Sequence, residues 1–77
     1  MKRNCEAVEI ARVREMARSG CAKAIRQRAR VSRSEIARSI EVDPSTIRRW
    51  EEGLRVPQGA AAIRYGALLR ELAELVP

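Results

Sequence analysis

Two helix-start signals within one short segment, Ser32–Gly53, constrain the fold more than any other feature of this sequence. The first is Ser32 followed three residues later by Glu35, the spacing of a capping box in which each side chain binds the other residue's backbone amide. The second is Asp43 before Pro44, because Asp accepts bonds from free helix amides and Pro fits the first helical position. Since Pro44 does not continue a preceding helix, the segment predicts two short helices joined by a tight turn.

Apolar residues recur on one side of each predicted helix. Ile36, Ala37 and Ile40 share one face of the first helix, and Ile47 and Trp50 lie one turn apart on the second. This pattern also fits a simple αα-corner in a small bundle. It favours a DNA-binding helix-turn-helix, in which the second helix enters the major groove.

The segment resembles the helix-turn-helix of the Cro and phage-repressor type, the XRE family. Counting from Arg33, the small residue that the motif has in fifth place is Ala37. The apolar residues of its fourth, eighth, tenth, fifteenth and eighteenth places are Ile36, Ile40, Val42, Ile47 and Trp50. The ninth place, usually a Gly at positive φ, is Glu41, at a cost of about 1 kcal/mol. The resemblance implies an all-α fold, a five-helix lambda-repressor-like bundle.

Length and composition agree with one small helical domain. The 77 residues are interpreted as a single helix-turn-helix domain, 1–77, with an extra N-terminal helix at 5–19 and a repressor-like core at 21–75. The chain has no Phe, one Trp and one Tyr, so we expect a core of Ala, Ile, Leu and Val. Richness in Ala, Leu, Glu and Arg favours helices.

The roles of the two outer helices stay open at this stage. The N-terminal helix, Cys5–Ser19, fits an arm on the DNA backbone, a subunit interface, or an extra helix that enlarges a small core. The last helix, Ala60–Leu75, carries more apolar surface toward its end than one side of so small a protein needs. That end fits either a dimer seam or packing against the N-terminal helix.

The charge balance predicts a polyanionic partner. Sixteen Lys and Arg against ten Asp and Glu give a net charge of +6, and all but Lys2 and Lys23 of the cations are Arg, which binds phosphates and guanine edges in a forked geometry. A solvated helical surface is the alternative explanation of the same composition.

By family position, the exposed start of the motif's second helix implies base contacts from four residues, Pro44, Ser45, Thr46 and Arg49. Pro44 has no side-chain donor and offers apolar contact only, for example with a thymine methyl group. Ser45 and Thr46 are short and discriminate modestly. Arg49 can donate two bonds to guanine O6 and N7, worth roughly 1–3 kcal/mol of discrimination. We therefore predict that Arg49 is the main specificity residue.

Three further arginines are predicted to contact DNA phosphates. Arg33 stands where the family often has a backbone-binding Gln, and Arg55 stands in the loop after the motif, where the family also contacts the backbone. Arg48 points about 100° away from Arg49 and fits a phosphate or the neighbouring acid Glu52. Arg55 also fits a solvent-facing loop cation.

The resemblance also implies one structural ion pair. The family has an Arg six residues before the Ser that starts the motif's first helix, and its partner is a Glu near the end of the second helix. These places are Arg26 and Glu51 here. A partly buried pair is costly to break from one side, because the surviving charge is left without a partner.

Several classes of function have no support in the sequence. There is no His, no Gly-rich phosphate loop and no nucleophile beside a base, so we expect no catalytic residue and no enzyme. Cys5 and Cys21 without His predict reduced thiols and no metal, and we expect no cofactor or small-molecule substrate. No apolar run approaches the roughly 20 residues of a membrane span, and no signal peptide is recognisable.

The sequence therefore predicts a repressor-like, sequence-specific transcriptional regulator that inserts residues 44–52 into the major groove of double-stranded DNA. A homodimer is compatible with this function, and we expect a cytoplasmic protein, prokaryotic or phage-encoded, that is associated with the nucleoid when bound. The alternatives are a protein-interaction module on the same fold, such as an antitoxin or phage accessory protein, and an architectural or RNA-binding basic protein.

Overall fold

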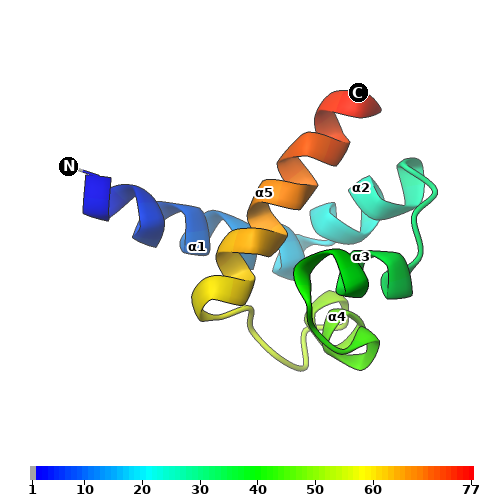
Figure 1. Ribbon diagram of the computed structural model, residues 1–77, viewed down its shortest axis with the longest axis horizontal. Helices are drawn as coiled ribbons and strands as arrows, with labels where there is room; N and C mark the ends of the chain where they lie inside the picture. The colour runs from blue at the N-terminus through cyan, green and yellow to red at the C-terminus, as the bar shows by residue number, and fades with distance from the viewer. Residues whose placement is uncertain (1) are drawn as a thin grey trace.

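Five helices joined by short connections form the part of the chain that the computed structural model describes, residues 2–77, with side chains described from Glu6 onward (Figure 1). They are α1 (Lys2–Ser19), α2 (Cys21–Arg28), α3 (Arg33–Ile40), α4 (Pro44–Glu51) and α5 (Gly59–Leu75). This part contains no strand, so the prediction of an all-α five-helix bundle is confirmed. The first helix begins at Lys2 rather than Cys5, and the last at Gly59 rather than Ala60.

The predicted start signals are confirmed at both helices of the motif. The Ser32 hydroxyl accepts from the Glu35 amide at 3.0 Å, and the Ser32 amide donates to the Glu35 carboxylate at 2.8 Å. At α4, the Asp43 carboxylate accepts from the Ser45 amide at 2.8 Å, and Pro44 occupies the first helical position. Each cap satisfies amides that a helix end leaves without partners.

The helix ends place two bulky residues in the left-handed region. Glu41 ends α3 with φ 62°, which confirms the conformation expected at the motif's ninth place. Arg30, after α2, has φ 60°, which the sequence did not indicate, whereas α4 is followed by Gly53 at φ 77°. At all three ends an amide one residue further on bonds back into the last helical turn, which closes the helix.

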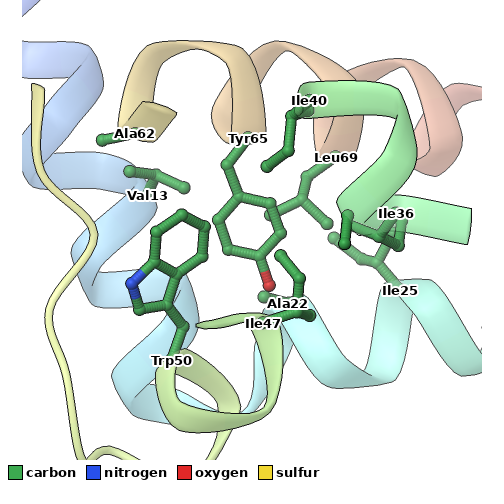
Figure 2. Close-up of a cluster of buried hydrophobic side chains, with 11 residues drawn as sticks. Val13, Ala22, Ile25, Ile36, Ile40, Ile47, Trp50, Ala62, Tyr65 and Leu69 are labelled. Carbon is green, nitrogen blue, oxygen red and sulfur yellow. The ribbon is translucent and has the colours of Figure 1, made fainter. Parts of the chain in front are cut away.

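The core collects apolar side chains from all five helices and is shown in Figure 2. Its centre is the contact between Trp50 of α4 and Tyr65 of α5, whose ring centroids lie 4.8 Å apart at an interplanar angle of 36°. The buried hydrophobic residues of the core are Val13, Ala17, Ala22, Ile25, Ile36, Ala37, Ile40, Ile47, Trp50, Ala62, Tyr65 and Leu69. Because Ile47 and Trp50 are buried under α5, the opposite side of α4 is left outward.

The first helix is packed into this bundle. Val13 and Ala17 of α1 are buried, and α1 packs against α5, which crosses it in Figure 1. The helices approach closely at Gly66, where an added Cβ atom would lie 2.6 Å from the Glu9 carboxylate. Of the roles considered for the N-terminal helix, enlargement of the core is therefore observed. Over residues 2–77, no helix combines the length and the apolar character that a membrane crossing requires.

Candidate nucleic-acid interface

The four residues predicted to contact bases lie on the part of α4 that the core leaves free. Pro44 is exposed, and Ser45, Thr46 and Arg49 are partly exposed. Ser45 and Arg49 are four residues apart on one helix, so their side chains share a face. The structure thus places a hydroxyl from the first turn and a guanidinium from the last turn on the same outward side of α4.

A hydrogen bond to Asp43 fixes the direction in which the Ser45 hydroxyl donates its proton. The Ser45 Oγ atom donates to Asp43 Oδ1 at 2.6 Å. The hydrogen bonds from the hydroxyl and the amide of Ser45 hold the pKa of Asp43 below its ordinary value, and the charge of Arg49 acts in the same direction. Since a hydroxyl has one proton, Ser45 is left with acceptor capacity only, which suits the amino groups of adenine or cytosine.

The neighbouring arginines of α4 differ in availability. Arg48 donates to Glu52 at 2.9 Å. Of the two partners predicted for Arg48, a phosphate or Glu52, the free protein therefore has the contact with Glu52. Both side chains are almost half exposed, and such a pair contributes only about 0.3–0.5 kcal/mol, so a phosphate can compete for Arg48. In the described part of the chain, the Arg49 guanidinium has no hydrogen-bond or ion-pair partner.

Behind α4, Glu51 lies between two arginines from two other helices. Arg26 of α2 donates to the Glu51 carboxylate at 2.6 and 3.2 Å, and Arg33 of α3 donates to it at 3.0 Å. The Glu51 side chain is 1% exposed, against 12% for Arg26 and 37% for Arg33. Although burial raises the pKa of Glu51, the hydrogen bonds from both arginines outweigh it and leave that pKa below its ordinary value.

This cluster fixes the orientation of α4 relative to α2 and α3. Arg26 also donates to the Val31 carbonyl at 3.1 Å, so its guanidinium joins the α2–α3 turn to α4. The contact between Arg33 and Glu51 was not anticipated from the sequence, because the family place of Arg33 pointed to DNA. The exposed part of its guanidinium still faces solvent at the start of α3, where free helix amides also favour an anion.

Arg55 lies in the loop between α4 and α5 and is exposed. It lines a cleft of about 390 Å³ together with Arg14 and Arg18 of α1 and with Trp50. Arg14 donates from Nε to the Pro57 carbonyl at 2.8 Å. Sequence reasoning missed Arg14, because the two residues are separated by 43 positions and no local pattern connects them. Among the described residues, no group of three His, Cys, Asp or Glu side chains is arranged to hold a metal ion.

Comparison with known families gives one match. A family model described as Helix-turn-helix matches residues 23–75, which extend from α2 through the last turn of α5 and leave α1 outside. Comparisons with curated proteins and with solved structures give no match.

Proposed function

The chain belongs to the helix-turn-helix family of DNA-binding regulators, of the Cro and phage-repressor (XRE) type, and from this premise we propose that it represses transcription by occupying a specific operator. The main support for this proposal is that α4 is held firmly on its inner face and, among the described residues, leaves an arginine unpaired on its outer face. Its inner face is fixed by Trp50 and by the bonds to Glu51, while the Arg49 guanidinium on its outer side is without a protein partner in the described chain.

In this proposal the outward side of α4 enters the major groove. Arg49 donates two bonds to a guanine, Ser45 accepts from an adenine or cytosine amino group, and Thr46 contacts an adjacent base edge. Pro44 makes apolar contact only. The helix arrives in a fixed orientation, because the cluster of Arg26, Arg33 and Glu51 is present before DNA binds, and this lowers the ordering cost of association.

Three arginines are proposed to set the position of the protein on the duplex through phosphates. The Arg55 side chain has no partner in the described part of the chain, whereas Arg48 exchanges Glu52 for a phosphate and Arg33 uses the part of its guanidinium that Glu51 leaves free. Each phosphate that is neutralised contributes about −0.9 to the slope of log affinity against log salt concentration. Binding should therefore weaken steeply as salt is raised.

Occupancy of the operator is proposed to depend on the protein's own concentration or on a partner, without a cofactor or small-molecule substrate. The protein is proposed to be cytoplasmic, and prokaryotic or phage-encoded. As a homodimer, the protein would select inverted half-sites whose centres are about one helical turn apart. As a monomer, it would select a single half-site.

Selection of bound duplexes from a random pool tests this function. We expect one short motif to be enriched, containing a guanine whose replacement lowers the affinity, and competition by random duplex to be weak. Tight binding without enrichment would contradict a sequence-specific repressor and favour an architectural protein. Absence of duplex binding at low salt would instead favour the protein-interaction module.

A further inference from the structure

The loop between α4 and α5 is joined to α1 by one side-chain hydrogen bond. The Arg14 Nε atom donates to the Pro57 carbonyl at 2.8 Å, and Pro57 itself is fully buried. In the described chain, no other side chain bonds to the backbone of residues 53–58. The start of the loop is held differently, by the amides of Leu54 and Arg55, which donate to the Arg49 carbonyl at 2.8 and 3.3 Å. Arg55 thus lies between an anchor on α4 and an anchor on α1.

The anchor on α1 is itself rigid. Val13 and Ala17, on either side of Arg14 in sequence, are buried in the bundle. Arg14 and Arg55 line the same cleft, so the α1 side chain that holds the loop is close to the cation that the loop presents. Helix α1 lies outside the region that the family match covers, residues 23–75. The contact is therefore a feature of this chain's additional helix.

We propose that Arg14 is a positioning residue for DNA binding: its bond to Pro57 holds the loop so that Arg55 reaches a DNA phosphate. The proposal rests on the proposed function, because it assigns Arg14 a part in the same interface. It differs from direct contact, in which Arg14 would itself neutralise a phosphate. In the positioning role the Nε–H donor matters and the charge does not.

Two substitutions of Arg14 separate the donor from the charge. Arg14→Gln places an amide nitrogen after the same three side-chain carbons, so it keeps a donor for the Pro57 carbonyl and removes the charge. Arg14→Met keeps the apolar stem and removes both. Arg18→Met is the matched control, since Arg18 lines the same cleft but, among the described residues, its side chain bonds only to Glu15.

The experiment measures affinity for the selected duplex as a function of salt concentration. We expect Arg14→Met to make the log–log slope less steep by about 0.9, equal to the effect of Arg55→Ala, so that affinity falls about 3.5-fold less between 50 and 200 mM salt. The double variant with Arg14→Met and Arg55→Ala should have the slope of Arg55→Ala alone. Arg14→Gln should bind like the wild type, and Arg18→Met should leave a steeper slope than Arg14→Met.

Other outcomes overturn the proposal. If the slope changes of Arg14→Met and Arg55→Ala added up in the double variant, Arg14 would itself contact a phosphate. The same would follow if Arg14→Met and Arg14→Gln reduced the slope equally. If Arg18→Met reduced the salt slope as much as Arg14→Met does, the effect would come from the positive charge that lines the cleft and not from the bond to Pro57. If Arg14→Met does not fold, Arg14→Gln decides, because weakened binding by that folded variant contradicts a role based on the donor. If Arg55→Ala has no effect while Arg49→Ala weakens binding, the positioning role of Arg14 is refuted and the proposed function stands. If neither substitution affects binding to any duplex, the proposed function fails.

Discussion

The Arg26 Nε atom of α2 lies 2.6 Å from the Glu51 Oε2 atom of α4, and the second carboxylate oxygen receives bonds from both Arg26 and Arg33. The helix proposed to enter DNA is therefore held from behind by a charge cluster that joins three helices. The Glu51 side chain is almost inaccessible, so water cannot replace its partners.

Removing the acid should be expensive in stability. Replacing Glu51 with Ala leaves Arg26, 12% exposed, without its partner. We expect the free energy of unfolding to fall by about 3 kcal/mol, near the lower limit for breaking a buried pair, because Arg33 can turn to solvent. Urea denaturation measures the loss. Glu52→Ala, which breaks only the exposed pair with Arg48, is the control and should change stability by less than about 0.5 kcal/mol.

The same carboxylate should make stability depend on pH. The pKa of Glu51 is lower in the folded protein than in the unfolded chain, because the bonds from Arg26 and Arg33 outweigh its burial. Its contribution is therefore complete above the unfolded pKa and is lost as pH falls through the lower folded value. As the pH falls from 6 to below the unfolded pKa of Glu51, we expect the wild type to lose more stability than Glu51→Gln. Parallel curves for the two proteins would contradict this.

Two residues hold left-handed conformations that Gly would adopt without strain. We expect Glu41→Gly, at φ 62°, to raise the free energy of unfolding by about 1 kcal/mol, and Arg30→Gly, at φ 60°, to do the same. Since Glu41 is not among the predicted base contacts, the order in which duplexes are preferred should not change. Chemical denaturation measures the change in stability, and competition binding measures the order of duplex preference. A loss of stability in both variants would contradict backbone strain at Glu41 and Arg30.

The sequence predicted what is specified locally. Ser32 with Glu35, and Asp43 with Pro44, define both helix starts of the motif because a cap and its helix are adjacent in the chain. The positive φ of Glu41 was also predictable from its place in the motif. Arg30 was not, because a left-handed Arg has no composition signal like that of Gly.

Contacts between distant segments could not be read from spacing. The bond from Arg14 to Pro57, that from Arg33 to Glu51, and that from Arg64 to the Ile40 carbonyl at 3.1 Å all depend on how the helices cross. The assignment of individual residues to bases and phosphates remains a prediction, because it concerns contacts with DNA.

The close approach of α1 and α5 predicts coupling between Gly66 and Glu9. A Cβ atom at position 66 would lie 2.6 Å from the Glu9 carboxylate, which also pairs with Arg12 and Arg70. Gly66→Ala alone should leave stability nearly unchanged, since displacing Glu9 offsets the gain of about 1 kcal/mol from better helix propensity. In a Glu9→Ala background that gain should appear in full. Thermal or urea unfolding of the four proteins measures the coupling, and equal effects in both backgrounds would contradict the contact.

The most direct test of the account is the effect of Arg49→Ala on discrimination between the selected duplex and random duplex. We expect affinity for the selected duplex to fall by roughly 5- to 150-fold, the equivalent of about 1–3 kcal/mol, with a much smaller change for random duplex. Arg48→Ala removes the same charge from the neighbouring position and should weaken both duplexes alike, as loss of a phosphate contact does. An equal loss on both duplexes for Arg49→Ala, or no loss, would contradict the assignment of α4 as the helix that reads the operator through Arg49.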